Sequence, residues 1–230
     1  MSARIKLSDF DHPVVQAKAK ELIKPEASLE ENLKSIFLYV RDEIKFGFPP
    51  KWDNVKASET IGYGIGYCNT KATLFNALCK IAEIPSRIHT GLIDLNIMRG
   101  IFPAYAFPFL PDSGGHSWIE VKINGDWKPV DSYINDVPLY EAALKQLLSG
   151  GKKTGYSLSL AKGPASCEFN FGEKGFVHMG AVVTDHGTWD DFSEYMASDK
   201  YLALSGFKLK VFHSFTRTGN RNIAKLRLIQ

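Results

Sequence analysis

Apolar residues recur three or four positions apart in four stretches of the chain, which is the spacing of one face of an α-helix. These stretches are residues 12–24, 28–44, 68–83 and 139–150. The second opens with Ser28 and Glu31 in the capping-box arrangement, and the fourth ends at Gly150 and Gly151, which favour helix termination. The pattern therefore predicts four helices, each with one buried face.

Alternating apolar and polar residues predict strands in the middle of the chain. Residues 86–94 form one such segment, and residues 116–123 and 126–133 form two more. The last two flank Asn124-Gly125, a dipeptide that favours a two-residue hairpin turn. We therefore expect an antiparallel hairpin at this point of the chain.

The other segments are less periodic. Residues 47–66 are rich in Gly, Pro and aromatic residues and are predicted as a long irregular loop, and residues 95–115 as a Pro- and Phe-rich insertion. Further along, the pattern predicts a strand at 176–183 and a helix at 188–198. Helices combined with antiparallel strands indicate an α+β fold, and the absence of repeats and low-complexity linkers favours a single domain over residues 1–230.

Composition and charge exclude several classes of protein. The 230 residues are 44% hydrophobic and 23% charged, as in ordinary globular proteins. A net charge of +3 is too small to predict nucleic-acid binding, and the sequence holds no apolar run long enough to predict a membrane span. Asp9 and Asp11 stand where a secretory signal would need an apolar run, so we expect a cytoplasmic protein.

Three cysteines are candidate reactive thiols: Cys68, Cys79 and Cys167. Their odd number and the lack of a secretion signal argue against a disulfide framework, and their spacing does not match a structural zinc site. Cys79 lies on the apolar face in the middle of a predicted helix, and Cys167 has no base near it in the sequence. We interpret both as unreactive.

Cys68 differs because three glycines precede it and a predicted helix begins at it. The positive end of the helix dipole and the free backbone amides at a helix start stabilise a thiolate, which predicts a lowered pKa for Cys68. The backbone N–H of Cys68 is also free to face a developing oxyanion. The alternative is a buried and inert cysteine.

The predicted hairpin selects a base for this thiol from six histidines. A two-residue turn pairs Trp118 with Asp131 and His116 with Tyr133, so His116 and Asp131 share one face of the hairpin as diagonal neighbours. A slip of one residue would send these two side chains to opposite faces. The alternative is a surface hairpin with incidental polar residues. The main rival base is His178, which stands in an apolar segment where a core histidine is the usual interpretation.

Two segments of the sequence together resemble the transglutaminase-like superfamily, the papain-related cysteine enzymes. They are "ASETIGYGIGYCNTKATLFNALCKIAEIPSRIHTGLID" and "GGHSWIEVKINGDWKPVDS". The family pattern is a glycine-led Cys at a helix start, an Ile-Pro-x-Arg step into a strand, a His opening the next strand and an Asp ending the one after. Cys68, Pro85, Arg87, His116 and Asp131 match it in order. The resemblance covers roughly residues 12–135.

The resemblance implies a papain/transglutaminase-like core in which the helix that bears the nucleophile packs on an antiparallel sheet. It implies that Cys68 is the nucleophile, that His116 is the base and that Asp131 orients His116. It also implies attack of the thiolate on an acyl carbon, a thioester intermediate, and no need for a metal or cofactor. Residues from about 136 to 230 would then form a C-terminal extension.

The sequence departs from the family pattern in two respects. The insertion at 95–115 is longer than the core motif needs, and its aromatic residues are candidates either for a substrate pocket or for a packed surface loop: Phe102, Tyr105, Phe107 and Phe109. Calcium-binding acidic clusters like those of the animal transglutaminases are not visible. A second oxyanion donor is also not assigned, with Trp52, Tyr63 and Tyr67 as candidates by position.

Several functions remain open at this point. We favour hydrolysis of an amide or peptide bond over protein crosslinking. The alternative is an acyltransferase or cyclase that acts on a carrier-bound acyl thioester, with a phosphate-bearing carrier held by the basic C-terminal residues. These residues are Lys208, Lys210, Arg217, Arg221, Lys225 and Arg227. A further alternative is a non-catalytic binding module, which an intact Cys, His and Asp set argues against. The oligomeric state is not predicted.

Overall fold

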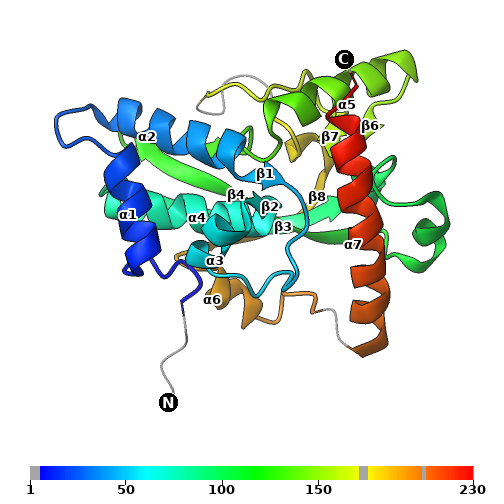
Figure 1. The fold of residues 1–230 in the computed structure, drawn as a ribbon, viewed down its shortest axis with the longest axis horizontal. Coiled ribbons are helices and arrows are strands. Elements are labelled where there is room, and N and C mark those ends of the chain that lie inside the picture. Colours follow the sequence, from blue (N-terminus) through cyan, green and yellow to red (C-terminus); the bar gives the residue numbers. More distant parts are fainter. Residues whose placement is uncertain (1–5, 171–175, 204–205, 230) are drawn as a thin grey trace.

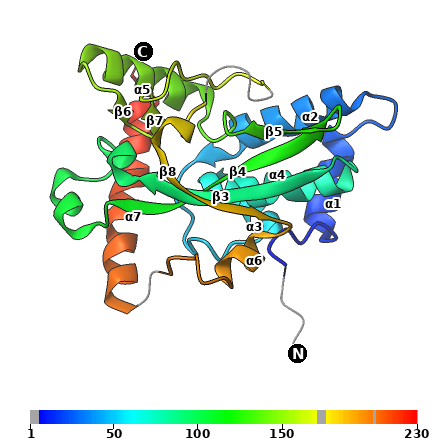
Figure 2. The ribbon, with the colours of Figure 1, turned by 180° about the vertical axis from the view of Figure 1, so that it is seen from behind.

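An antiparallel sheet of four strands forms the centre of the fold (Figure 1). The computed structural model describes residues 6–170, 176–203 and 206–229. In spatial order the strands of the sheet are β5 (Asp126–Val130), β4 (Ser113–Ile123), β3 (Ser86–Asp94) and β8 (Val182–Trp189). The helices gather on one face of this sheet, as the view from behind shows (Figure 2).

The central helix, α4 (Cys68–Ile81), packs against β3 and β4. All of its residues from 68 to 79 are buried, because α1 (Pro13–Leu22), α2 (Leu29–Leu38) and α3 (Ala57–Tyr63) also pack on it. A helix that is enclosed on several sides is held rigidly, so the first residue of α4 is placed accurately relative to the sheet.

The remaining elements are short, apart from two helices. They are the π-helical turn Tyr39–Glu43, β1 (Lys45–Phe46), β2 (Ile65–Gly66), the 3₁₀ turns Leu95–Met98, Ala104–Phe109 and Met179–Ala181, α5 (Val137–Ser149), β6 (Thr154–Gly155), β7 (Leu158–Ser159), α6 (Phe192–Met196) and α7 (Gly206–Leu226). β1 and β2 pair in parallel, and β6 and β7 pair antiparallel.

The expected α+β class is confirmed, and α4 and β3 lie close to their predicted bounds. The predicted irregular loop at 47–66 is wrong in part, because it contains α3 and ends in β2. The predicted helix at 28–44 is α-helical to Leu38 and continues as a π-helical turn. Elements of two to seven residues contain too little sequence to show a period, which is why the pattern missed them.

The predicted strand at 176–183 is wrong over its first half. The backbone N–H groups of residues 177–179 donate to the side chain of Asp131 rather than to a neighbouring strand, and β8 begins only at Val182. The predicted helix at 188–198 is present as the shorter α6.

β8 lies beyond residue 135 but completes the sheet by pairing with β3. The expected core of about 12–135 and the expected extension of about 136–230 therefore share one sheet. The assignment of residues 1–230 to a single domain stays a prediction. Among the helices that the structure describes, none has the length and apolar character needed to cross a bilayer.

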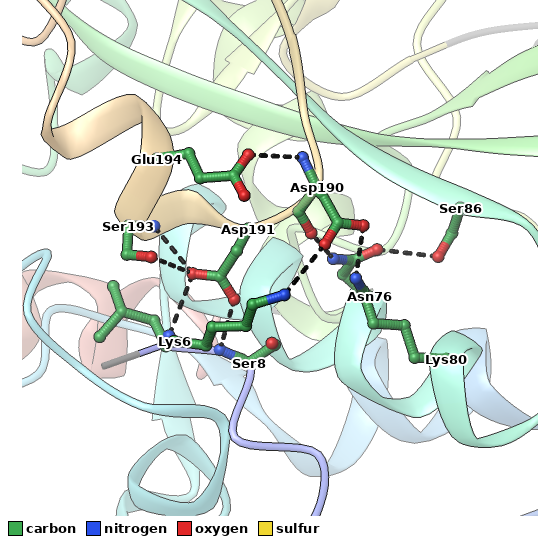
Figure 3. Close-up of polar contacts among 10 residues, drawn as sticks. Lys6, Ser8, Asn76, Lys80, Ser86, Asp190, Asp191, Ser193 and Glu194 are labelled. Atoms are coloured by element: carbon green, nitrogen blue, oxygen red, sulfur yellow. Dashed lines mark hydrogen bonds and ion pairs between the residues drawn. The ribbon is translucent and has the colours of Figure 1, made fainter. Parts of the chain in front are cut away.

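The N-terminal segment is tied to the chain just before α6 (Figure 3). The backbone N–H groups of Leu7 and Ser8 donate to the carboxylate of Asp191, each at 3.0 Å. Nζ of Lys80, near the C-terminal end of α4, pairs with the carboxylate of Asp190 at 2.5 Å. These contacts join the N-terminal segment, α4 and α6 at the end of α4 opposite to Cys68.

α7 is packed against the body of the protein through α5. Just beyond its C-terminal end, Arg227 donates to both carboxylate oxygens of Asp136 at 2.8 and 2.6 Å and to the carbonyl of Phe46 at 2.7 Å. The side chain of Asn220 exchanges hydrogen bonds with the backbone N–H and carbonyl of Phe48 at 2.9 and 3.0 Å. α7 therefore fixes the segment around Phe46 and Phe48.

The substitution Arg227→Met should lower the free energy of unfolding by about 3 kcal/mol, because it leaves the buried carboxylate of Asp136 without its cation. Burial raises the pKa of Asp136, but Arg227, with smaller contributions from Lys71 and the backbone N–H of Phe46, outweighs this effect and holds the pKa below its usual range. The contribution is therefore present at neutral pH and is lost only as the pH falls below the ordinary pKa of an aspartate, toward the lower pKa of the folded state. Urea unfolding at pH 7 and at about pH 2.5 measures this loss. The exposed Arg221→Met is the control, and an equal loss in both variants would contradict the assignment.

Candidate active site

An apolar pocket opens at the N-terminal end of α4. Cys68 and His116 both line it. Most of the other lining side chains are apolar or aromatic: Phe46, Phe48, Trp52, Tyr67, Ile93, Leu95, Met98, Phe102, Pro111, Tyr201 and Leu202. An apolar lining with a few polar groups is typical of a small-molecule or side-chain binding site.

The close approach of β2 to α4 places Cys68 at the start of the helix. A Cβ atom on Gly66 would lie 2.7 Å from Oγ1 of Thr70 and 2.9 Å from Cγ of Lys71, so only glycine fits. Oγ1 of Thr70 accepts the backbone N–H of Tyr67 at 3.1 Å, which fixes the first turn of α4. The expectation that a glycine-led turn delivers Cys68 to a helix start is confirmed.

The predicted low pKa of the Cys68 thiol is wrong. Cys68 is 6% exposed, and burial raises the pKa of its thiol to about 12, although the backbone amides of Ser117, Asn69 and Cys68 itself lower it. The helix start supplies the expected amides, but the loss of water at the sulfur has the larger effect. Burial likewise lowers the pKa of His116 well below its usual value, and His178 lowers it further. The thiol and the imidazole are therefore both neutral at pH 7.

A buried acid, Asp53, is linked to the thiol through Asn69, and no sequence pattern predicted it. Sγ of Cys68 lies 3.4 Å from Oδ1 of Asn69, and Nδ2 of Asn69 donates to the carboxylate of Asp53 at 2.7 Å. The same carboxylate accepts the hydroxyl of Tyr67 and, at 2.7 Å, the hydroxyl of Tyr201. Tyr201 lies far from Asp53 in the sequence, and Tyr67 and Asn69 follow it at no distinctive spacing. Pattern analysis therefore could not predict these contacts.

Asp53 binds two of the three candidates for a second oxyanion donor. The hydroxyl of Tyr67 is committed to Asp53, and the side chain of Trp52 is hydrogen-bonded to it as well. Tyr63 is 36% exposed and does not line the pocket. The three candidates therefore have no free donor directed at Cys68 in this arrangement.

The hairpin register is confirmed. β4 and β5 pair with Ile119 opposite Val130 and Ile123 opposite Asp126, as a two-residue turn requires. The ladder ends at Val130, and Asp131 follows directly after it. The other face of the hairpin packs on the core, with Ile119 and Val130 both buried. Because the pairing stops at Val130, the shared face of His116 and Asp131 stays a prediction.

The carboxylate of Asp131 does not bind His116 in this structure. It accepts three backbone N–H groups, from Val177, His178 and Met179, each at 2.8 Å. Burial raises the pKa of Asp131 to about 6, although these amides lower it. Both ring nitrogens of His116 are buried and have no hydrogen-bond partner among the described residues.

Among the described rings, that of His178 lies nearest to His116. Its ring centroid lies 5.2 Å from that of His116, and both residues line the pocket. Nε2 of His178 lies 2.7 Å from Oγ of Ser157. The expectation of a buried histidine at position 178 is confirmed, but the residue lies in a loop rather than a strand and borders the site.

The other sequence candidates lie elsewhere. Cys79 is fully buried within α4 and Cys167 is 3% exposed, and neither lines the pocket. Of the four aromatic residues in the insertion, only Phe102 lines the pocket, whereas Tyr105 and Phe109 are 67% and 75% exposed. In the described part of the chain, no group of three or more His, Cys, Asp or Glu residues is arranged to hold a metal ion.

The substitution Asp131→Asn should weaken the attachment of the segment 177–179. Both oxygens of Asp131 accept backbone N–H groups, so the NH₂ group of an asparagine would place a donor opposite at least one of these donors. An unsatisfied buried donor costs about 2 kcal/mol, which should appear in urea unfolding. Hydrogen–deuterium exchange at the amides of residues 177–179 should accelerate. Unchanged exchange rates at these amides would contradict the hydrogen bonds between the carboxylate of Asp131 and residues 177–179.

The chain matches the family described as "Transglutaminase-like superfamily" over residues 16–132, just over half of its length. Among solved structures it is similar to a protein from Cytophaga hutchinsonii named "Putative Cysteine Protease", with 15% identity and a TM-score of 0.47. That similarity covers 84% of this chain and 46% of the other, so the chain spans about half the length of that protein. No curated protein matches. The family match shows that the chain belongs to the transglutaminase-like superfamily.

Proposed function

We propose that this protein is a cysteine-dependent acyl-transfer enzyme that acts on an amide or related acyl bond. The observation that carries the proposal is the shared position of Cys68 and His116 in one apolar pocket, at a helix start and on the adjacent strand. Membership of the superfamily supports this assignment. Cys68 is proposed as the nucleophile, His116 as the base and Asp131 as the third member of the triad.

The proposed reaction starts from a neutral thiol and a neutral imidazole, because burial disfavours the charged form of both. Sγ of Cys68 attacks the acyl carbon while His116 takes the thiol proton. The carbon–nitrogen bond then breaks, and His116 returns the proton to the leaving amine, which leaves a thioester on Cys68. His116 then takes a proton from a water molecule, whose oxygen attacks the thioester carbon. The carbon–sulfur bond breaks, the acid is released, and His116 returns the proton to Sγ of Cys68.

The pocket favours an apolar acyl group. Its walls carry Phe48, Met98 and Phe102, and none of its described lining residues is Lys or Arg. The carboxylate of Asp53 also lines the pocket, but its oxygens are occupied by Tyr67, Asn69 and Tyr201. We therefore favour hydrolysis of an amide or peptide bond next to an apolar group. A cytoplasmic location stays a prediction from the sequence.

The second candidate function is transfer of an acyl chain from a phosphate-bearing carrier. Arg217, Arg221 and Lys225 are exposed and follow one another four residues apart, so they share one face of α7. Gly219, on the same helix, approaches the pocket-lining Phe48 and Phe102. The basic row therefore lies on a helix that also borders the pocket. Lys208 and Lys210 have side chains outside the described part of the chain.

Iodoacetamide should label Cys68 faster than Cys79 and Cys167, because of the three cysteines only Cys68 lines the pocket. The rate at Cys68 should rise with pH from 7 to 10 without reaching a plateau, because the thiol pKa is about 12. Peptide mapping by mass spectrometry measures the three rates, and Cys68→Ala is the control. Equal labelling of all three cysteines would contradict the assignment of Cys68 as the nucleophile.

Combined replacement of Arg217, Arg221 and Lys225 by Gln should weaken the binding of a phosphate-bearing acyl carrier in low salt, and added salt should remove the difference. A phosphopantetheine thioester is a suitable probe, with a simple amide substrate as the control. Unchanged use of the thioester at low salt would contradict the carrier function and would leave the amide hydrolase function standing.

A further inference from the structure

We propose that α7 sets the size of the acyl group that the pocket accepts, because Gly219 leaves room for the rings of Phe48 and Phe102 to lie back from Cys68. This inference rests on the proposed function, in which the acyl group on Cys68 occupies the pocket. It makes Gly219 a specificity-determining residue that acts through two aromatic side chains. α7 (orange to red in Figure 1) lies outside the residues 16–132 that match the family, so this role belongs to a part of the chain that the family pattern does not cover.

The rings of Phe48 and Phe102 stand between Gly219 and the pocket. Both rings line the pocket, whereas Gly219 does not. A Cβ atom at position 219 would lie 3.1 Å from Cε1 and 3.2 Å from Cδ1 of Phe102, and 3.3 Å from Cε2 of Phe48. Favourable contacts between carbon atoms begin at about 3.5 Å, so a side chain here would displace a neighbour by a few tenths of an ångström. Gly219 therefore determines how closely α7 and the two rings can pack.

Hydrogen bonds from α7 keep the backbone from absorbing this displacement. The side chain of Asn220, directly after the glycine, holds the backbone N–H and carbonyl of Phe48 at 2.9 and 3.0 Å. Nδ2 of Asn222 donates to the carbonyl of Ile101, the residue before Phe102, at 2.8 Å. α7 and the two wall segments are thereby tied together beside each ring, so a side chain at position 219 would move the rings themselves.

Of the two rings, that of Phe102 makes the closer contact with a Cβ atom at position 219. The ring of Phe48 is also packed against Trp52 and Tyr67, with ring centroids 5.9 Å apart in each case. The ring of Phe102 packs on that of Phe48 at 5.2 Å and borders the open space of the pocket. With α7 behind it and the pocket in front, the Phe102 ring is expected to turn into the pocket.

The space that this wall bounds suits the apolar part of a substrate. Apart from the two rings, the lining includes the apolar side chains of Ile93, Leu95 and Met98. An acyl chain is stabilised by each methylene group that it buries among such side chains, as long as the wall leaves room for it. The inferred substrate class is therefore an apolar acyl group longer than acetyl, with its upper size set by the wall that Gly219 supports.

Chain length in a series of p-nitrophenyl esters tests this role. Sγ of Cys68 attacks the ester carbon, the carbon–oxygen bond breaks, and the thiol proton passes through His116 to solvent, so each acylated Cys68 releases one p-nitrophenolate. Rates with the acetate and the hexanoate are compared for the wild-type protein, Gly219→Ala and the matched control Gly62→Ala. Gly62 is exposed on α3, and a Cβ atom there would meet nothing within 4 Å.

The ratio of the hexanoate rate to the acetate rate should fall about tenfold in Gly219→Ala, which is the discrimination that one methylene group can cause in an apolar pocket. Gly62→Ala should keep the wild-type ratio. Adding Phe102→Leu to Gly219→Ala should restore the ratio, because the smaller side chain leaves the space free again. An unchanged or higher ratio in Gly219→Ala, or no restoration by Phe102→Leu, would overturn the inference.

The same assay separates failure of this inference from failure of the proposed function. If Cys68→Ala or His116→Ala releases p-nitrophenolate as fast as the wild-type protein, the proposed function fails. If release depends on both residues and the ratio does not change in Gly219→Ala, only the inference fails.

Phe102→Leu alone covers the case in which Gly219→Ala does not fold. By widening the pocket, it should raise the ratio of the decanoate rate to the hexanoate rate above the wild-type value. A ratio at or below the wild-type value would show that the Phe102 ring does not limit the acyl group and would overturn the inference.

Discussion

The rest of the site depends on one contact, in which the carboxylate of Asp131 accepts hydrogen bonds from three consecutive backbone N–H groups. It bridges the end of the β4–β5 hairpin and the loop that leads into β8, so it joins the two parts of the chain that supply the sheet. It also holds the backbone of His178, whose ring centroid lies 5.2 Å from that of His116. Charge-assisted bonds of this kind are strong, and burial makes them difficult to exchange for water.

Burial also sets the chemical state of the site. The thiol of Cys68 and the imidazole of His116 both lose water, which raises the pKa of the former and lowers that of the latter. A neutral thiol is a weaker nucleophile than a thiolate. In the proposed mechanism, the proton moves only as the sulfur attacks, and the transfer needs a well-oriented base more than a preformed thiolate.

Local sequence patterns predicted the features that depend on local structure. The start of α4 at Cys68 follows from the glycines before it, and the register of β4 and β5 follows from a two-residue turn. Contacts between residues far apart in the sequence could not be predicted from local patterns. For example, no spacing indicates that the side chain of Asp131 accepts the backbone N–H of His178. The thiol pKa was mispredicted for the same reason, since burial depends on residues distant in sequence.

Mass spectrometry of the protein after incubation with a short-chain acyl thioester, such as butyryl-N-acetylcysteamine, and acid quenching tests the central claim most directly. If Cys68 is the nucleophile and His116 its base, wild-type protein carries one butyryl group on the peptide that contains Cys68, and His116→Ala accumulates it much more slowly. A butyryl group on Cys79 or Cys167, or equal acylation of the wild-type protein and His116→Ala, would contradict the account.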